Sequence, residues 1–445
     1  MQPLTRRHFA RQAGLATAAS YSRILGANDR VGVGFIGVGN QGDVVHGAFL
    51  EYGDAQTVAV CDLRDDYMDF AVRKARTNPV KYKEYRDLLA NKAVDAVVIA
   101  TPDHWHALMF IDACNAGKDV YVEKPFSLTV AEGRKMVETA ERTRRVVQVG
   151  LHFRSLPWSR EAAEFVRSGG IGQVTAARCF QIENIWPAGI GNPPDEPPPN
   201  EWEWEHWLGP APKVPYNRNR MFYKFRMFYD YSGGQLTNSG VHVLDLVRWC
   251  LGQDAPSAVT AMGGKYALKD NSEIPDTLEV LWQFGGPTLV TFTQYDASSA
   301  PGGGRPSNIE LRGTKGTMYI TGSSWEVVPE KVTDLPRFAR TPLDRETEKR
   351  TYSPSRRTLI EPRGGKGTQD HTFHARNFLD CVKSRARCHA DAQIGHLSTS
   401  VTILGNIALR TKSYLEWDPR AERFTNHPSA NRWLHYEYRP PYRLG

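Results

Sequence analysis

The sequence has no long uninterrupted apolar run and no long basic run. None of the apolar stretches approaches the roughly 20 residues that a membrane-spanning helix needs, so we expect no membrane span. The net charge is +7, and four arginines within residues 1–27 account for +4, which leaves +3 for the rest of the chain. We therefore expect no nucleic-acid partner.

Metal-binding and redox cysteine motifs are also missing. None of the six cysteines belongs to a C-x-x-C pair, which argues against a zinc site or a redox dithiol, and we predict no metal. Cys61 and Cys114 lie in apolar patterns typical of buried free thiols. Cys381 and Cys388 could pair if the protein is exported, because export permits disulfides without requiring them.

The first 27 residues contain no acidic residue. Arg6 and Arg7 are paired, Phe9 stands two places after the second arginine, and a short Ala/Gly segment follows. This combination resembles a twin-arginine (Tat) export signal, a route for proteins that are already folded, often around a cofactor. A disordered basic tail is the alternative. We expect a periplasmic or otherwise exported protein, and a cytoplasmic one if the signal is not functional.

Length and pattern predict two domains after this N-terminal segment. Residues 28–150 alternate strand-like and helix-like segments, which is typical of a parallel sheet with right-handed crossovers. Residues 151–445 differ, since strand candidates between 257 and 328 are joined by short Gly-containing turns that favour an antiparallel sheet. The helices expected in this second part lie at 157–169, from about 238 onward, at 370–384 and at 392–412.

The stretch "GVGNQG" is a G-x-G-x-x-G motif in a specific context. A strand-like run leads into it, a helical stretch follows, and Asp62 stands twenty residues after Gly42, at the end of the next strand. Gly37 permits the tight turn, Gly39 lets the backbone approach a pyrophosphate, and Gly42 lets the helix pack closely. We predict a dinucleotide site; a structural turn of the same kind without a ligand is the alternative.

One acidic and one basic side chain indicate which dinucleotide binds. The helix begins near Asn40 and Gln41, and its first amides should face the pyrophosphate. Asp62 should hold the adenosine ribose hydroxyls and repel a 2′-phosphate, which favours NAD over NADP. Arg64 keeps NADP open, because a nearby arginine can accept that phosphate.

Five segments in order, "FIGVGNQG", "VAVCD", "ATPDHWHA", "AGKDVYVEKP" and "GGQLTNSGVHVLDLVRW", carry a family resemblance. They resemble the Gfo/Idh/MocA oxidoreductases, relatives of glucose–fructose oxidoreductase and inositol dehydrogenase. The resemblance implies a Rossmann domain over 28–150 and a C-terminal α/β domain over 151–445 with a large open, mostly antiparallel sheet. It also implies hydride transfer between a nicotinamide and a carbinol carbon of a sugar or polyol.

The resemblance also implies site residues. Lys124 matches the lysine of the E-K-P tripeptide, which lies near the nicotinamide and the reacting hydroxyl, and His242 matches the catalytic histidine. Asn238 falls where inositol dehydrogenase-like members carry Asp, which weakens a simple Asp–His proton relay, because an amide can only hydrogen-bond. The further residues expected beside the cofactor are Thr101, Pro102, His104 and Glu123.

The residues themselves suit carbinol oxidation, which needs a hydride acceptor, a base and a positive group for the developing alkoxide. A pKa of about 6.5 suits His242 to the base role. Lys124 suits the electrostatic role, and could be the base if burial lowers its pKa. Asn238 and His242, four residues apart, would share one face of a helix, and Asp245 could instead orient the histidine locally. A surface lysine and a buried structural histidine are the alternatives.

Other polar and aromatic residues are candidates for substrate contact. His152 and Arg154 follow the last Rossmann strand, where ligand crevices form, with a domain-interface role as the alternative. Residues 184–232 are rich in proline, asparagine and aromatics, and rings such as Trp186 and Tyr231 could form a carbohydrate platform. The alternative is that these rings pin a long loop to the sheet or to another subunit.

Three functions follow. The first is an exported oxidoreductase that acts on a sugar, polyol or glycoside with a tightly held NAD, since no cofactor pool exists outside the cell. The second is redox-neutral glycoside cleavage by oxidation, elimination or hydrolysis, and hydride return. The third, favoured by Asn238, is a non-catalytic NAD- or sugar-binding relative. We also expect a homodimer or homotetramer, because an open sheet face favours association.

Overall fold

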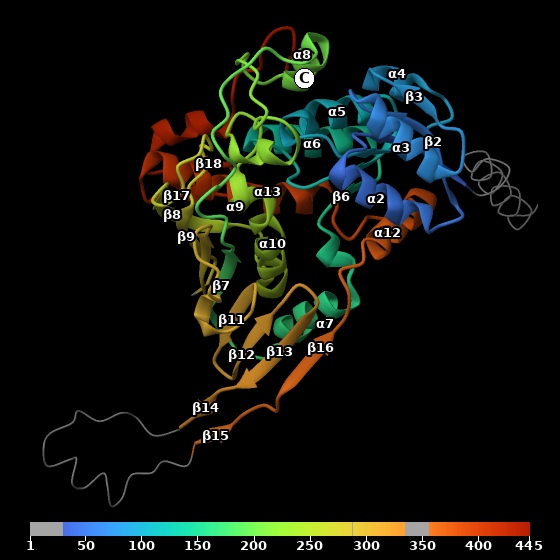
Figure 1. Ribbon diagram of the computed structural model, residues 1–445. Coiled ribbons are helices and arrows are strands. Elements are labelled where there is room, and N and C mark those ends of the chain that lie inside the picture. The colour runs from blue at the N-terminus through green and yellow to red at the C-terminus, as the bar shows by residue number, and fades with distance from the viewer. Residues whose placement is uncertain (1–29, 287, 334–355) are drawn as a thin grey trace, which may run out of the picture.

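The computed structural model describes residues 30–286, 288–333 and 356–445 (Figure 1). The Tat-like segment lies outside these residues, so the export signal stays a prediction. None of the described helices is long and apolar enough to cross a membrane.

The first half of the structure is a parallel sheet of six strands in the order β3-β2-β1-β4-β5-β6. Its central strands β1, β4 and β5 are buried along their whole length, which explains their continuous Val/Ile-rich sequences. The strands are β1 (Val31–Ile36), β2 (Ala55–Cys61), β3 (Val80–Tyr82), β4 (Ala96–Ile99), β5 (Asp119–Val122) and β6 (Val147–Val149).

Helices cover both faces of this sheet (Figure 1). One apolar cluster joins the sheet to α2, α3 and α12, and another joins it to α4, α5 and α6. These helices are α2 (Asn40–Leu50), α3 (Asp65–Ala75), α4 (Tyr85–Ala90), α5 (Asp103–Asn115), α6 (Val130–Thr143) and α12 (Thr372–Ser384). Because α12 comes from the end of the chain, part of the C-terminal segment completes the Rossmann layer.

The second half is built on a ten-stranded sheet in the order β16-β13-β12-β11-β7-β10-β9-β8-β17-β18. Only the β7–β10 pair is parallel among its recorded pairings, so the predicted large, mostly antiparallel sheet is confirmed. The strands are β7 (Val174–Ile182), β8 (Pro256–Gly264), β9 (Thr277–Phe284), β10 (Thr288–Tyr295), β11 (Ile309–Gly313), β12 (Gly316–Ile320), β13 (Ser324–Pro329), β16 (Arg363–Lys366), β17 (Leu415–Asp418) and β18 (Arg423–Phe424). A separate pair is β14 (Lys331–Val332) with β15 (Arg357–Thr358).

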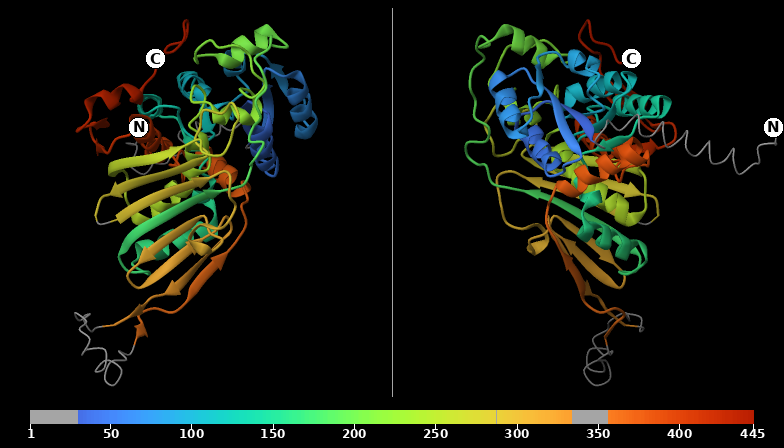
Figure 2. Two further views of the ribbon diagram at one scale, coloured as in Figure 1. Left: turned by 60° about the vertical axis from the view of Figure 1, so that its left-hand side comes forward. Right: turned by 90° about the vertical axis from the view of Figure 1, so that its right-hand side faces the viewer.

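One face of the large sheet carries the helices (Figure 2). Trp282 and Phe292 of the sheet are fully buried in the main core beside apolar side chains of these helices. The alternating burial along β9 fits a sheet with one face packed in this way. The helices are α7 (Pro157–Arg167), α10 (Gly240–Leu251) and α13 (Ala392–Thr411), with the short α9 (Gly234–Asn238) preceding α10.

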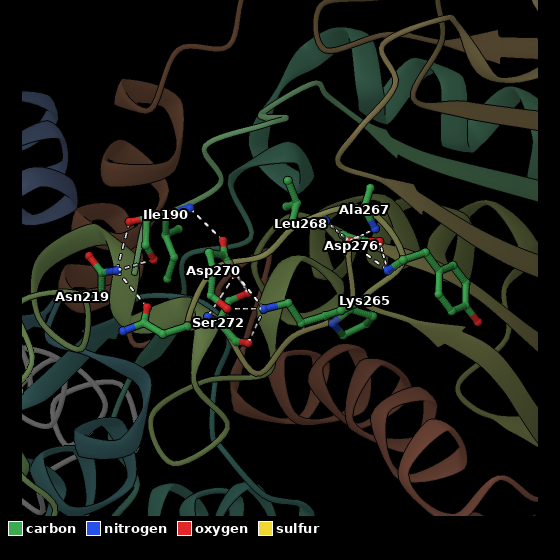
Figure 3. A network of polar contacts seen from close by, with 12 residues as sticks. Ile190, Asn219, Lys265, Ala267, Leu268, Asp270, Ser272 and Asp276 are labelled. Atoms are coloured by element: carbon green, nitrogen blue, oxygen red, sulfur yellow. Dashed lines mark hydrogen bonds and ion pairs between the residues drawn. The ribbon is translucent and has the colours of Figure 1, made fainter. Parts of the chain in front are cut away.

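The long aromatic segment, residues 184–232, is pinned to the loop between β8 and β9 (Figure 3). The Asp270 carboxylate accepts hydrogen bonds from the Ile190 amide at 2.8 Å and from Lys265 Nζ at 2.8 Å. Asn219 Nδ2 donates to the Ile190 carbonyl oxygen at 2.9 Å. The segment contains α8 (Glu201–Leu208) and the 3-10 helix η2 (Phe222–Met227), and its anchoring holds η2 over the junction between the two halves.

The six cysteines are all buried free thiols. The thiols of Cys381 and Cys388 lie beside each other at the end of α12 and in the loop before α13, and their hydrogen bond is the main cause of the raised pKa of Cys388. A disulfide between them stays a prediction for an oxidising compartment.

Candidate active site

The turn between β1 and α2 is built from three glycines, two of which, Gly37 and Gly42, leave no room for a side chain. Gly37 has φ +81°, and a Cβ on Gly42 would lie 2.1 Å from the Gly37 carbonyl oxygen. A Cβ on Gly39 would lie 3.3 Å from the Tyr67 ring. None of the described side chains caps α2, so its first amides stay available to an anion.

Asp62 lies at the end of β2, next to this turn. Its Oδ2 accepts a hydrogen bond from the Val38 amide at 2.9 Å, and its Oδ1 accepts one from the Arg64 amide at 3.0 Å. Burial raises the pKa of this carboxyl. Each carboxylate oxygen retains a lone pair for a ribose hydroxyl, while the Arg64 guanidinium is paired with Asp66 at 2.5 Å.

A cleft, which we call the cofactor cleft, runs from the glycine turn to Lys124. Thr101 Oγ1 is buried there without a protein partner among the described residues, as expected beside a bound ligand. Gly42 and His104 do not line this cleft, since Gly42 packs on the turn behind it. The predicted cofactor residues that do line it are Gly37, Gly39, Asn40, Gln41, Asp62, Arg64, Thr101, Pro102, Glu123 and Lys124.

Glu123 forms part of the wall of the cofactor cleft. The residue is 3% exposed, and its carboxylate accepts hydrogen bonds from Gln41 Nε2 at 3.2 Å and from the Lys124 amide at 3.2 Å. A Cβ on Gly150 would lie 2.7 Å from Glu123 Oε1, so the end of β6 makes room for this carboxylate. Glu123 therefore links the start of α2 to the lysine.

Lys124 is held by Asn238 from the other half of the structure. Its Nζ donates to the Asn238 side-chain oxygen Oδ1 at 3.0 Å and to the Asn238 backbone carbonyl at 3.3 Å. Burial lowers the pKa of Lys124, Glu123 opposes this, and the nearby Arg226 lowers it further. The neutral amine is therefore easier to reach here than in water.

The prediction of one helix carrying Asn238 and His242 is wrong in detail. The helix is interrupted at Ser239, between α9 and α10. The His242 amide donates to the Ser239 carbonyl at 3.2 Å, which leaves the Asn238 carbonyl to Lys124. Asn238 thus orients the lysine instead of the histidine, although both residues line the same cavity.

A chain of amides fixes the orientation of Asn238. Its Nδ2 donates to Gln235 Oε1 at 3.2 Å, and Gln235 Nε2 donates to Glu183 at 2.8 Å. Arg226 Nε donates to the same Asn238 Oδ1 that Lys124 uses, at 3.1 Å. An aspartate at this position could not donate to Gln235, so the departure from the family pattern matches its surroundings.

His242 belongs to a cluster of histidines. The ring centroids of His152 and His242 are 5.0 Å apart, and the His371 ring stacks on His152 at 4.2 Å. Burial lowers the pKa of both His152 and His242 well below 6.5, and Lys124 further lowers that of His242. The His242 ring is therefore neutral at neutral pH and can exchange hydrogen bonds with a hydroxyl.

A second cavity, which we call the sheet cavity, opens beside Lys124 and His242 against β7 and β10. Its wall includes Phe180 and Phe292 from the sheet and Tyr223 from η2. No aspartate or glutamate among the described residues lines it. The side-chain amides in its lining are those of Asn40, Gln41, Gln181, Asn238, Asn308 and Gln369.

Six predicted residues lie outside the wall of either cavity, namely Gly42, His104, His152, Arg154, Trp186 and Tyr231. Arg154 is buried in an ion pair with Asp245 of α10 at 2.8 Å, a contact within the second half of the structure. His104 is fully buried, and its Nε2 contacts the Trp207 carbonyl oxygen at 3.0 Å. Tyr231 is buried in the apolar cluster of the aromatic segment, and Trp186 is 59% exposed.

Sequence reasoning missed several side chains of the sheet cavity. Arg226 lies in "YKFRMFYDY" without a motif around it, and Gln369 precedes α12 in an equally featureless stretch. The same stretch holds His371, which stacks on His152 behind His242. Tyr223 was predicted only as one ring among many in the aromatic segment. Their common place beside Lys124 depends on contacts between distant parts of the chain.

Two family models match the chain. One describes an oxidoreductase family with an NAD-binding Rossmann fold and matches residues 31–151. The other describes the C-terminal alpha/beta domain of that oxidoreductase family and matches residues 170–276 and 366–444. These matches, over most of both halves of the structure, place the chain in an oxidoreductase family with an NAD-binding Rossmann fold. The chain belongs to the Gfo/Idh/MocA family.

Individual relatives either match a smaller part of the chain than the family models do or share little of its sequence. Proteins named glycosyl hydrolase family 109 protein, from Shewanella baltica and Shewanella putrefaciens, are each 32% identical over 220 residues. These matches cover 42% of this chain and 47% of each relative. The chain therefore spans about half the length of the curated relatives it matches.

Solved structures share the fold over most of the chain. Levoglucosan dehydrogenase in complex with NADH and levoglucosan aligns with a TM-score of 0.62 and 18% identity, covering 87% of this chain and 99% of that one. The apo scyllo-inositol dehydrogenase from Lactobacillus casei aligns with a TM-score of 0.59 and 18% identity, covering 87% and 98%. At this identity the likeness concerns the fold.

Proposed function

We infer that the protein transfers a hydride between NAD and a carbinol carbon of a sugar, polyol or glycoside. The observation that carries this proposal is the position of Lys124, which lines both the cofactor cleft and the sheet cavity. A substrate hydroxyl in the sheet cavity can thus reach the lysine beside the cofactor. The amide-rich wall of that cavity offers the donors and acceptors that a polyhydroxylated ring requires.

The chain's own residues handle the proton. When bound, NAD supplies the hydride acceptor or donor. Asn238 holds Lys124 Nζ through two hydrogen bonds, and the lowered pKa of the lysine lets its amine accept the hydroxyl proton. The neutral His242 ring hydrogen-bonds the substrate and adds no second charge beside the lysine.

Replacement of Lys124 tests the proposal. Lys124→Ala should lower turnover by roughly 10²- to 10⁴-fold, the range that a positioned acid–base group contributes. Lys92→Ala, at an exposed position on the Rossmann half, is the matched control and should keep full activity. Initial rates on a panel of sugars and glycosides, with circular dichroism to check folding, are the measurement. Unchanged turnover in Lys124→Ala would overturn the assignment.

Redox-neutral glycoside cleavage is a second candidate, favoured by the relatives named glycosyl hydrolase family 109 proteins. In that reaction an oxidised sugar carbon acidifies a neighbouring C–H, a base removes this proton, and the aglycone leaves as its alcohol. Water then adds to the resulting double bond, and the hydride returns to the oxidised carbon. A glycoside supplied without added NAD should then release aglycone with no net NADH. Binding of NAD and sugar with no turnover at all would instead support the non-catalytic alternative.

Export with a retained cofactor is part of the proposal. The paired Arg6 and Arg7 support it, because a Tat route lets the chain leave the cell with NAD already bound. Native mass spectrometry of the purified protein should find NAD bound, a shortened N-terminus, and a mass corresponding to a homodimer or homotetramer. Free exchange of NAD with solution would count against cofactor retention.

A further inference from the structure

We propose that the sugar accepted by this site is a sugar acid, whose carboxylate binds Arg226. This inference rests on the proposed function, because it assigns the substrate class of the same cavity. It comes from three observations: how Arg226 is held, which charges surround it, and what else lines the cavity.

Arg226 is held in place with one edge unused. Its Nε donates to Asn238 Oδ1 at 3.1 Å and its Nη1 donates to the Tyr223 carbonyl at 3.1 Å. The guanidinium carbon lies 4.5 Å from the centroid of the Tyr223 ring and 4.6 Å from that of Phe225. Its Nη2 has no acceptor among the described residues, although the side chain lines both the cofactor cleft and the sheet cavity. An arginine fixed in this way suits a planar anion such as a carboxylate.

The charges around Arg226 are unbalanced on the side of the sheet cavity. Lys124 and Arg226 share one neutral acceptor, Asn238 Oδ1, where an aspartate would have placed a negative charge. The nearby acids Glu123 and Asp103 line the cofactor cleft and not the sheet cavity. Glu183 reaches Asn238 only through the amide of Gln235.

A neutral sugar in the sheet cavity would offer this edge of Arg226 no charged group. Two of the six amides, those of Gln41 and Asn238, already bond protein groups, and the other four can hydrogen-bond ring hydroxyls without any cation. The Arg226 guanidinium therefore favours a negatively charged sugar over a neutral hexose. A ligand carboxylate at Nη2 would supply the negative charge that the cavity wall lacks, and would leave Lys124 to the reacting hydroxyl.

The test compares methyl β-D-glucuronide, methyl β-D-glucoside and glucose 6-phosphate on the NAD-loaded protein. Turnover gives kcat/KM for each compound, and isothermal titration calorimetry gives its affinity without any need for turnover. The wild type should prefer the glucuronide by roughly 10- to 100-fold, the range expected for a hydrogen bond to a charged group.

Four variants attribute this preference to Arg226. Arg226→Gln should remove most of it, and Arg226→Lys, which keeps the charge but loses the planar fork, should retain part of it. Asn238→Asp should also lower it, because a protein carboxylate would compete for both cations. Lys224→Gln removes a charge two residues away that contacts the Ile190 carbonyl and Asn219, so the preference should remain. Circular dichroism checks that each variant is folded.

The outcomes separate this inference from the proposed function. Turnover of the glucoside at least equal to that of the glucuronide, with no effect of Arg226→Gln on their ratio, overturns the sugar-acid inference and leaves the oxidoreductase proposal standing. A preference for glucose 6-phosphate overturns the carboxylate in favour of a phosphate. Arg226-dependent binding of the glucuronide without turnover supports the inference and overturns the proposed function. Neither binding nor turnover of any compound overturns the sugar-acid inference.

Discussion

The two sides of the active site are made in different ways. The cofactor side is backbone-defined: the turn from Gly37 to Gly42 and the end of β2 lie within a short stretch, and close packing excludes side chains there. The substrate side is made by side chains from the turn after β5, from β7, β10, η2, α9 and α10, and from the loop before α12, which are far apart in the sequence.

This difference determines what each side can change without loss of the fold. The glycine turn allows little substitution, because a Cβ on Gly37 would lie 2.8 Å from the Ala100 backbone and one on Gly42 would lie 2.1 Å from the Gly37 carbonyl oxygen. The cavity wall, in contrast, depends on single side chains such as Arg226 and Gln369, which can be replaced one at a time. The comparison therefore predicts a constant cofactor site and a variable substrate site.

The largest expected effect concerns Arg154, a substrate candidate in the sequence that the structure places in the interior. Arg154→Met should destabilise the protein by about 3 kcal/mol, because it removes the bidentate partner of the buried Asp245 carboxylate and leaves only the longer 3.7 Å contact with Arg248 and a hydrogen bond from Ser398. Urea unfolding is the measurement, and the exposed Arg167→Met is the control. If the variant had normal stability and a raised KM, Arg154 would be a substrate-binding residue and not a structural one.

The next effect tests the backbone-defined side. Gly42→Ala should weaken NAD binding by roughly 10- to 100-fold, because overpacking of this kind typically costs about 1–3 kcal/mol and the new Cβ would force the turn and α2 apart. Gly53→Ala is the matched control, since a Cβ there meets nothing within 4 Å. Calorimetric titration with NAD measures both. Equal affinities would show that the turn is not rigid.

Sequence reasoning predicted the backbone-defined side well and the side-chain-defined side poorly, for a physical reason. Strand periodicity, the glycine turn and Asp62 are local patterns, and both sheets follow from them. The interruption at Ser239 and the placement of Arg226 and His371 depend on packing between distant segments. Lys124 and Asn238 were predicted through family motifs, but their hydrogen bond to each other was not.

The smallest expected effect concerns the contact that holds α12, and the cavity loop before it, on the Rossmann layer. The hydrogen bond from Arg376 lowers the pKa of Asp54 to about 2 from 3.8, burial opposes this, and Lys383 adds to it. Since the folded pKa is depressed, the contact stabilises the fold above about pH 4, and this stabilisation is lost as the pH falls through about 2.

Asp54→Asn should therefore cost about 1 kcal/mol at pH 6, a value reduced for partial exposure, and nothing near pH 2. Urea unfolding across this pH range gives the difference between variant and wild type, and the exposed Glu138→Gln serves as the control. If α12 also positions the loop with Gln369, the same variant should raise KM slightly and leave NAD affinity unchanged. If substrate affinity and NAD affinity fell equally in this variant, α12 would support both sides of the site.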